Sequence, residues 1–354
     1  MPVTAVIPSH NGGERLVRTI EALEQQTLQL AEIIVVDDAS DDGTSARVAE
    51  RFPCVRLIRL DANVGLSATR NAGLREARTD LVLMVDHDIY LAPECVERLV
   101  RGREELGAVA ACPRIRLFPD CEIVQADGAE PHFVGTLRLR NGWRRASEPP
   151  PAEAAYVGAV PGGCLLVQRS PVLEAGGFDE LIFFYFEDLE LSIRLRALGH
   201  RLAVVPAAEA YHDRGAGLPG LAFRGRGSYP ARRLQLTLRH RLLVILVHYR
   251  VRTLLVLAPA LILYELASLA LALSRGLGGE WARAWEWEVR HASALVERRK
   301  RMQRGRVCAD REILVGGPLP LAPGVVRSRA AHAAVRCLGS GLNAYWRITR
   351  RLIG

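Results

Sequence analysis

The chain has 354 residues, of which 49% are hydrophobic and 6% aromatic, an ordinary composition for a folded protein with a sizeable core. Its 7 cysteines never occur as Cys-x-x-Cys, which argues against both a disulfide scaffold and a zinc site. Residues 1–225 hold 24 basic and 32 acidic side chains, a net charge of −8, whereas residues 226–354 hold 23 and 7, a net charge of +16. We therefore expect two domains, a soluble α/β unit over 1–225 and a basic, apolar helical region over 226–354.

Short apolar runs alternate with longer amphipathic stretches over the first part of the chain. Continuous runs of Val, Ile and Leu are typical of parallel strands whose two faces are both covered by helices. We therefore predict a mostly parallel βαβ sheet, with strands over 3–7, 33–36, 55–60 and 81–85. Helices are predicted to begin near Thr44, Ser67 and Pro93, which lie in or next to capping residues.

After residue 113 the pattern loosens. Prolines bound segments that we predict to be irregular or edge strands, and an acceptor loop could lie there. These prolines are Pro113, Pro119, Pro131 and the run Pro149-Pro150-Pro151. Regular structure returns with a strand predicted over 157–169, a helix over 186–198 that ends at Gly199, and a strand over 201–206.

Beyond residue 226 the chain becomes both apolar and basic. Residues 253–274 carry one charge, Glu265, and are long enough to cross a bilayer, although Glu265 and Pro259 lie near the middle. Arginines flank the stretch on both sides, so their distribution predicts no orientation. A true span stays open, as do core helices packed on the α/β unit; we favour helices that lie on or dip into the cytoplasmic leaflet.

The same region contains an aromatic cluster beside a basic one. Trp281, Trp285 and Trp287 precede a basic run over 298–301, which fits an interfacial belt beside a polybasic patch. Nucleic-acid-binding modules seldom combine arginine clusters with long apolar runs. We therefore expect an anionic membrane surface, and no nucleic acid, as the partner of residues 226–354. The amino terminus shows no signal-peptide pattern, so we expect a peripheral or monotopic protein on the cytoplasmic side of the membrane.

Polar segments end or follow four of the predicted strands. In open α/β sheets, ligands bind outside the carboxyl ends of the strands, so these segments are candidates for a site. They are Pro8-Ser9-His10-Asn11, Asp37-Asp38-Ala39-Ser40, the loop 61–65 and Asp86-His87-Asp88. Each alone is also explained by helix capping or a turn. Two pairs of carboxylates at one sheet edge repel each other unless a cation or hydrogen-bond donors lie between them, so the combination favours a metal-bound nucleotide.

Six motifs in this order resemble the inverting glycosyltransferases of family 2, and among them the rhamnosyltransferases. The motifs are VIPSHN at 6–11, IVVDDASDDGT at 34–44, GLSATRN at 65–71, DHD at 86–88, GGFDE at 176–180 and FEDLELSIR at 186–194. The resemblance implies an α/β GT-A fold, the nucleotide-diphospho-sugar transferase fold, with a mostly parallel central sheet. A helical carboxyl-terminal region would follow it. Two departures are His10, where an aromatic Tyr is common, and Glu190, where many relatives carry Asp.

The resemblance also implies a nucleotide site at the sheet edge. Asp38 would accept a hydrogen bond from the base, and Pro8 and Asn11 would shape the wall of that pocket. Gly65, Arg70 and Asp86 would complete the nucleotide-binding set, Asp86 by reaching the ribose or the metal.

A divalent metal, Mn²⁺ or Mg²⁺, is the cofactor that the resemblance implies. Asp88 would bind it directly and His212 would be a further ligand. A hard cation with oxygen ligands neutralises the diphosphate and lowers the barrier to its departure. An imidazole ligand would tilt the preference toward manganese.

Asp188 is the candidate general base. Inversion requires an acceptor hydroxyl to attack opposite the departing nucleotide, and a carboxylate within hydrogen-bond reach can take its proton. Capping of the following helix is the structural alternative for Asp188. Glu187 is the neighbouring candidate, and it would line the acceptor or sugar pocket with Gly162 and Gly163. Glycines there would let the backbone approach the sugar or the acceptor.

The sequence thus predicts a metal-dependent hexosyl- or deoxyhexosyltransferase. The donor would be a nucleotide diphosphate sugar and the acceptor a hydroxyl of a glycan or a polyprenyl-linked precursor of the cell envelope. The alternative is a non-catalytic scaffold protein that binds a nucleotide sugar. An NAD-dependent enzyme is disfavoured because no GxGxxG motif follows the first strand.

Overall fold

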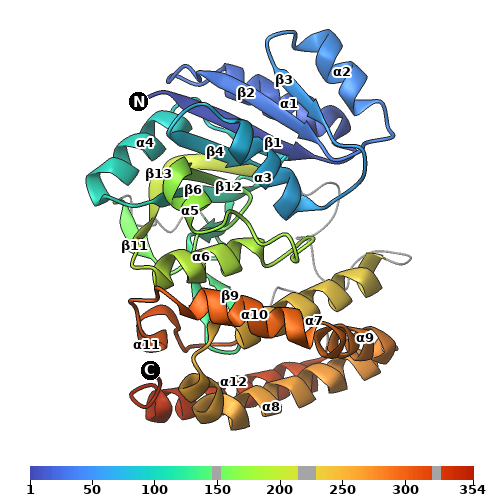
Figure 1. The fold of residues 1–354 in the computed structure, drawn as a ribbon, viewed down its shortest axis with the longest axis vertical. Coiled ribbons are helices and arrows are strands. Elements are labelled where there is room, and N and C mark those ends of the chain that lie inside the picture. The colour runs from blue at the N-terminus through green and yellow to red at the C-terminus, as the bar shows by residue number, and fades with distance from the viewer. Residues whose placement is uncertain (146–152, 214–228, 321–327) are drawn as a thin grey trace. The chain divides into compact units, whose positions relative to one another are not determined.

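The computed structural model describes residues 1–145, 153–213, 229–320 and 328–354 (Figure 1). The chain divides into two compact units. The second unit takes Glu130–Arg138 and Arg196–Gly199 in addition to the described residues from 229 onward, and the first takes the remaining described residues up to 213. The domain boundary expected at 225 lies among residues 214–228, outside the described residues.

Four parallel strands form the amino-terminal half of the main sheet in the first unit. Strand β1 (Val3–Ser9) pairs in parallel with β2 (Glu32–Asp37) and with β4 (Leu81–Val85), and β2 pairs in parallel with β3 (Arg56–Arg59). All four lie where the apolar runs predict them. Val3, Thr4, Ala5 and Val6 of β1 are fully buried, as expected of a strand covered on both faces.

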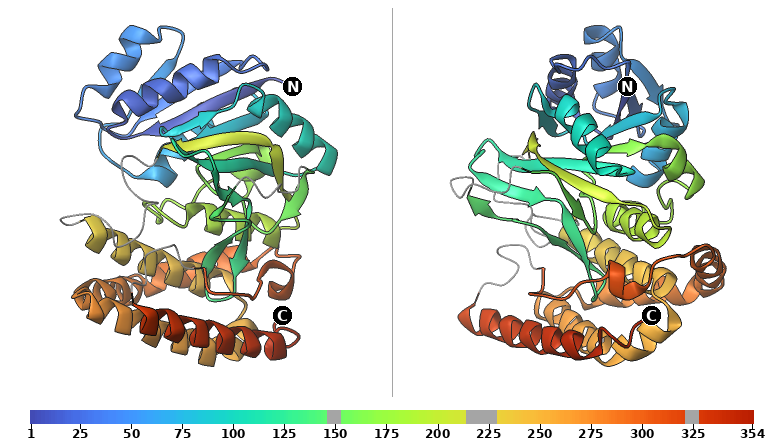
Figure 2. Two further views of the ribbon diagram at one scale, coloured as in Figure 1. Left: turned by 180° about the vertical axis from the view of Figure 1, so that it is seen from behind. Right: turned by 90° about the vertical axis from the view of Figure 1, so that its left-hand side faces the viewer.

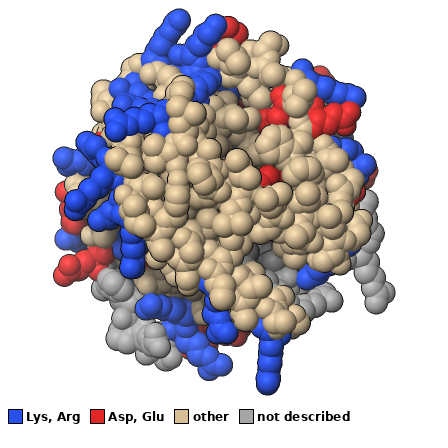
Figure 3. Space-filling view, turned by 90° about the horizontal axis from the view of Figure 1, so that it is seen from below, with Lys and Arg blue, Asp and Glu red and all other residues tan. Residues whose placement is uncertain are grey.

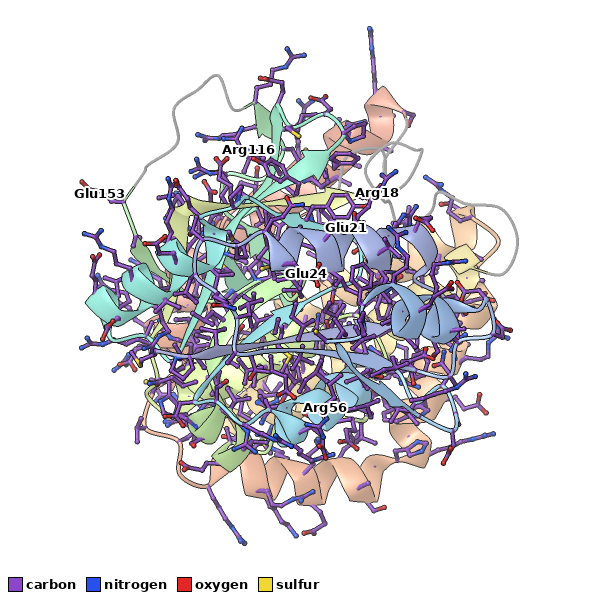
Figure 4. All side chains as sticks on the ribbon, turned by 90° about the horizontal axis from the view of Figure 1, so that it is seen from above. Arg18, Glu21, Glu24, Arg56, Arg116 and Glu153 are labelled. Carbon is purple, nitrogen blue, oxygen red and sulfur yellow. The ribbon has the colours of Figure 1, made fainter. Side chains whose placement is uncertain are left out.

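Helices cover both faces of this sheet. Helices α1 (Gly13–Glu24), α2 (Thr44–Arg51) and α4 (Cys95–Leu106) pack on one face, and α3 (Leu66–Glu76), α5 (Arg169–Glu174) and α6 (Glu187–Ala197) pack on the other. On α1 the apolar residues recur at helical spacing, so Leu16 and Ile20 are buried. The polar side chains of α1, such as Arg18 and Glu24, lie on its exposed side (Figure 4).

The rest of the main sheet is mostly antiparallel. From β4 the strand order continues through β12, β6 and β7 to β10, while β13 pairs with β6, β11 and β5. Their bounds are β5 (Ile89–Leu91), β6 (Ala110–Phe118), β7 (Ile123–Asp127), β10 (Arg144–Arg145), β11 (Ala155–Val157), β12 (Cys164–Gln168) and β13 (Leu202–Asp213). The α/β fold is therefore present as expected, with a mixed sheet whose parallel half carries the polar strand ends.

Two expectations for this half differ from the structure. The single strand predicted over 157–169 is two strands, β11 and β12, because Pro161-Gly162-Gly163 interrupts it. Pro113 does not bound an irregular segment; it lies within β6, between β12 and β13. The pairing of β6 with β13 shifts register just after the pair Pro113 and Val205, and such an irregularity tolerates the missing N–H of proline.

The second unit is mainly helical, as the sequence predicts (Figures 1 and 2). A small hairpin of β8 (Ala129–His132) and β9 (Thr136–Leu139) joins it. Phe133 in the hairpin turn stacks on Trp346 with ring centroids 5.0 Å apart. The helices are α7 (Tyr229–His248), α8 (Val251–Ser274), α9 (Gly278–Arg290), α10 (Ala292–Gln303), α11 (Asp310–Ile313) and α12 (Arg329–Thr349).

Candidate active site

The polar strand ends predicted from the sequence lie at one edge of the main sheet. Strand β1 pairs with β2 through Ser9 and Asp37, the last residues of both strands. Because β4 runs parallel to β1 on its other side, Asp86 and Asp88 follow at the same edge. The carboxyl ends of the parallel strands therefore bring these acids to one place, as the sequence analysis requires.

The end of β2 is fixed to the loops on both sides of it. The Asp38 carboxylate accepts hydrogen bonds from the N–H groups of Val64 at 2.8 Å and Gly65 at 3.0 Å. Gly65 has a φ of +89°, and a Cβ there would lie 2.5 Å from Phe183. Only glycine fits this position. Asp38 thus positions the loop that follows β3, and its contact with a nucleotide base stays a prediction.

Pro8 and Asn11 occupy different positions along the first strand and its loop. Pro8 is buried within β1, and Asn11 is exposed beyond it with a φ of 52°. The Asn11 N–H donates to Ser40 Oγ at 2.9 Å, and Asn11 Oδ1 accepts from the Asp41 N–H at 3.0 Å. The loops after β1 and β2 therefore form one continuous wall.

Arg70 of α3 joins three segments that are far apart in the sequence. One of its terminal nitrogens donates to Glu187 Oε1 at 2.9 Å, and the other donates to Asp86 Oδ1 and to the Gly162 carbonyl, each at 2.7 Å. The side chain is 0% exposed, and its guanidinium lies 5.3 Å from the ring centroid of Phe178. The sequence predicts a nucleotide contact for Arg70, whereas in the structure its terminal nitrogens are occupied by protein oxygens.

The two predicted pocket glycines lie between the acids. The Gly162 N–H donates to Asp188 Oδ2 at 3.0 Å, and the Gly163 carbonyl accepts from the Asp86 N–H at 2.9 Å. A Cβ at Gly162 would lie 3.0 to 3.2 Å from atoms of Arg70, Asp188 and Glu187. The structure therefore brings Asp86, Glu187 and Asp188 together around Arg70 and Gly162.

The start of α6 holds its two acids through a constrained backbone. Tyr185 and Phe186, directly before Glu187, have φ values of 69° and 74°, which residues other than glycine rarely adopt. Arg194, about two helical turns further along α6, donates to Glu190 at 2.9 Å and to the Gly177 carbonyl at 2.5 Å. Such strain persists only where the surroundings fix it, and it is concentrated at functional sites.

Burial raises the pKa of all three acids in this cluster. It raises the pKa of Glu187 to about 7 against the opposing effect of Arg70, and it raises the pKa of Asp188 and of Asp86. Among the described residues, Glu187 Oε2 and Arg70 Nε have no hydrogen-bond partner. Several acids within reach of one another, with raised pKa values, are a typical setting for proton transfer.

Asp88 and His212 face each other at the same sheet edge. His212 Nε2 lies 3.4 Å from Asp88 Oδ2, and its Nδ1 lies 2.9 Å from Gln125 Oε1. Burial opposes ionisation of Asp88, but His212 outweighs it and holds the pKa of Asp88 below its usual value. If Nδ1 donates to Gln125, the Nε2 lone pair and a carboxylate point at one another, an arrangement that a proton or a cation stabilises.

The protein alone offers a small ligand set for a metal. In the described ranges, no group of three or more His, Cys, Asp or Glu residues is arranged to hold an ion. Mg²⁺ is usually bound by one or two protein ligands together with substrate phosphates, so a pair of ligands fits a metal that arrives with a diphosphate.

Sequence reasoning misses Gln125, Phe178 and Tyr90 as parts of this edge. Gln125 lies on β7 and orients His212, and Phe178 lies against Arg70. Tyr90 donates to Asp213 Oδ2 at 2.8 Å. Phe178 lies in a quoted motif and could have been found there, but Gln125 carries no local signal because its role depends on strand pairing.

Comparisons with known proteins show which sequences this chain is similar to. The model of the family described as Glycosyl transferase family 2 matches residues 4–145. The N-acetylglucosaminyl-diphospho-decaprenol L-rhamnosyltransferase of Mycobacterium tuberculosis (strain ATCC 25618 / H37Rv) is 28% identical over 235 residues, which cover 60% of this chain and 76% of that protein. The succinoglycan biosynthesis protein ExoO of Rhizobium meliloti (strain 1021) is 35% identical over 127 residues, 36% of this chain and 35% of that protein.

Two solved structures show the same fold. The structure of GalNAc-T7 with UDP, GalNAc and Mn²⁺ matches with a TM-score of 0.57 and 19% identity, over 76% of this chain and 51% of that chain. This chain therefore spans about half of its length. The structure of S. aureus TarS 1-349 in complex with UDP-GlcNAc matches with a TM-score of 0.54 and 16% identity, over 98% of this chain and 92% of that chain. The expected GT-A fold is thus confirmed.

Proposed function

The chain is a member of glycosyl transferase family 2 through its amino-terminal part, and on this premise we propose that it transfers one sugar, with inversion, from a nucleotide diphosphate sugar to an acceptor hydroxyl. The observation that carries the proposal is the cluster around Arg70. It links Asp86, at the end of β4, to Glu187 and Asp188, at the start of α6. A donor-binding edge and a candidate base thereby share one place in the fold.

Asp188 is the group that we assign as the general base. Its Oδ2 accepts the Gly162 N–H, which orients the carboxylate, and burial raises its pKa. A raised pKa makes the carboxylate a stronger base, provided that it stays ionised at the working pH. Glu187 is bonded to Arg70 through Oε1, and burial raises its pKa to about 7, so we assign it to the wall of the sugar pocket.

The nucleotide and its diphosphate would lie along the sheet edge. Asn11 and Asp38 would form the wall after β1 and β2, supported by Pro8, which is buried near the end of β1, and Gly65 lets the loop after β3 pass close to that wall. Asp86 reaches the same edge with Oδ2, since Oδ1 is bonded to Arg70. We assign Arg70 to positioning these acids, because its buried side chain acts through them.

Asp88 and His212 are the residues that would hold Mn²⁺ or Mg²⁺. Bound there, the cation would neutralise the diphosphate and make it a better leaving group. Gln125 would fix the His212 ring so that Nε2 faces the cation.

The acceptor class follows from the mycobacterial relative. Its name describes transfer of L-rhamnose to a diphospho-decaprenol-linked sugar. We propose an acceptor of this kind, a sugar linked through a diphosphate to a polyprenol, and a deoxyhexose or hexose donor. Such an acceptor would place the reaction at the cytoplasmic side of the membrane.

The test is release of nucleotide diphosphate by the purified chain. We expect one donor from a panel of nucleotide sugars to release its diphosphate with Mn²⁺ and a polyprenyl-diphosphate-linked acceptor, and EDTA to abolish release. His212→Ala should raise the Mn²⁺ concentration that gives half-maximal rate. A chain that binds a donor, as seen by thermal shift, but releases no nucleotide diphosphate with any acceptor would be the scaffold protein instead.

The pH dependence of kcat/KM is expected to report the base. Asp188 must be ionised to accept a proton, so activity should be lost as the pH falls through its raised pKa. Arg70 lowers the pKa of Asp188, so Arg70→Met, measured under conditions in which it stays folded, should move the acid limb of the profile to higher pH. An unchanged limb, or one moved to lower pH, would exclude Asp188 as the titrating group; Asp80→Asn, an exposed acid before β4, is the control.

A further inference from the structure

Helix α8 exposes a stripe of large apolar side chains along its length. Val251, Leu255, Ile262, Leu266 and Leu273 are separated by four or seven residues, so they lie on one side of the helix. All five are exposed, Leu255 at 72%. These five residues are called the α8 stripe below. A continuous exposed apolar stripe of this length is unusual on a soluble protein and marks an interaction surface.

The flank of α8 beside the stripe is fixed to other helices of the second unit. The Glu265 carboxylate accepts hydrogen bonds from Arg241 at 2.6 Å, from Trp281 Nε1 at 2.9 Å and from Trp285 Nε1 at 3.1 Å. Arg241 is buried, and it also donates to the Val134 carbonyl. Of the two charged residues of α8, Glu265 is therefore held on the flank of the helix by contacts with α7 and α9 and paired with Arg241, and Arg252 is exposed at its start.

The two ends of α8 are held as well. The Arg250 N–H at its start donates to Asp310 Oδ2 at 2.7 Å. Near its other end, Ala272 packs in an apolar cluster with Leu238 and Ala284. Tyr345 of α12 donates to the Val256 carbonyl at 2.6 Å, and α12 lies alongside α8 (Figure 2). Helix α8 is thus attached along its whole length.

This attachment argues against a helix that crosses the bilayer. In the described part of the chain, α8 is the one helix long and apolar enough to span a membrane. If it spanned, its partners would have to enter the bilayer too, and α9 has 13 residues where about 20 apolar ones are needed. Helix α9 also carries Glu280, Arg283 and Glu286, whose charges would meet hydrocarbon.

Basic residues accompany the stripe. The end of α12 exposes Ile348 at 76%, and the exposed arginines Arg347, Arg350 and Arg351 surround it. Seen from below, uncharged residues cover most of the face formed by this part of the molecule; Lys and Arg lie along much of its margin, and Asp and Glu lie at smaller parts of it (Figure 3). An apolar surface with a basic margin is complementary to hydrocarbon edged by anionic headgroups.

We propose that the α8 stripe lies in the plane of an anionic lipid bilayer, inserted to the depth of the acyl-chain boundary, with the arginines at the end of α12 on the headgroups. The helix binds one leaflet and does not cross the membrane. This binding needs neither donor nor acceptor, so it goes beyond the transferase proposal and can be measured without it.

The experiment is flotation of the full chain with vesicles. We expect binding to phosphatidylcholine vesicles that contain one third phosphatidylglycerol, and much weaker binding to pure phosphatidylcholine. The triple variant Leu255→Gln, Ile262→Gln, Leu266→Gln should bind at least about tenfold more weakly, because each side chain loses its transfer from water. Val296→Gln with Val307→Gln, two exposed apolar residues of the second unit outside the stripe, is the matched control and should bind as the unchanged chain does.

The charge and the topology are tested separately. Arg347→Gln, Arg350→Gln, Arg351→Gln should weaken binding to the anionic vesicles and reduce its dependence on salt. Alkaline carbonate should release the bound protein, since a helix on one leaflet is extracted and a spanning helix is not. Retention after carbonate, equal binding by the stripe variant, or no binding to either vesicle would each overturn the proposal. Asp188→Asn should bind vesicles normally, so a failure of catalysis and a failure of membrane binding are distinguished.

Discussion

Replacing Asp188 by asparagine is expected to lower kcat by about 10²- to 10⁴-fold, the usual contribution of a general base. Asparagine has the same shape, and its side-chain oxygen can still accept the Gly162 N–H that Asp188 accepts at 3.0 Å. The change therefore removes the proton acceptor with little effect on the geometry. The rate of nucleotide diphosphate release at saturating donor and acceptor is the measurement.

Donor binding and a control variant show whether the loss of activity in Asp188→Asn comes from the loss of the base. Donor binding, followed by thermal shift with Mn²⁺, should be retained in Asp188→Asn, because the nucleotide site that we propose is built from the strand ends. Asp80→Asn changes an exposed acid before β4, at the opposite edge of the sheet, and should leave kcat unchanged. If Asp188→Asn keeps near-normal activity while Glu187→Gln loses it, the base is Glu187.

Arg70→Met is expected to destabilise the first unit by about 3–5 kcal/mol. Methionine fills a similar volume but leaves the buried carboxylates of Asp86 and Glu187 without their cation. Burial already raises the pKa of Glu187 to about 7, and loss of Arg70 would raise it further. The free energy of unfolding in urea, followed by a signal of the first unit, is the measurement.

The control variant changes another arginine of α3, and the rescue variant changes an acid that Arg70 contacts. Arg75 lies on α3 too, exposed, and pairs with Glu180 at 3.1 Å at the surface, so Arg75→Met should cost less than about 1 kcal/mol. Adding Glu187→Gln to Arg70→Met removes one uncompensated charge and should recover part of the loss. Equal stabilities of Arg70→Met and Arg75→Met would mean that the buried ion pairs do not hold the site together.

The pH dependence of the free energy of unfolding also tests the effect of Arg70 on Glu187, and the direction of the change can be predicted. The folded pKa of Glu187, about 7, is above its ordinary value, so the folded state binds this proton more tightly than the unfolded chain does. Its contribution to stability is therefore present at low pH and is lost as the pH rises through about 7. In Arg70→Met the loss should extend to higher pH and be larger.

Local patterns in the sequence were enough to predict the parallel half of the sheet and the candidate acids. Apolar runs give β1, β2 and β4 because a strand buried on both faces needs apolar residues at every position. Since the carboxyl ends of parallel strands share one edge, Asp38, Asp86 and Asp88 could be placed together before any coordinates. The helical character of the carboxyl-terminal region followed from composition in the same way.

Long-range pairing decided the rest, because its signals are spread over residues that are distant in the chain. The sequence shows an arginine at Arg70, but only the fold shows that it is buried and bonded to Asp86 and Glu187. Gln125 reaches His212 only because β7 and β13 both lie next to β6. Glu265 looks like an obstacle to membrane binding in the sequence. In the structure Glu265 pairs with Arg241 and accepts hydrogen bonds from two tryptophans, because only tertiary packing determines which side chains of a helix are covered.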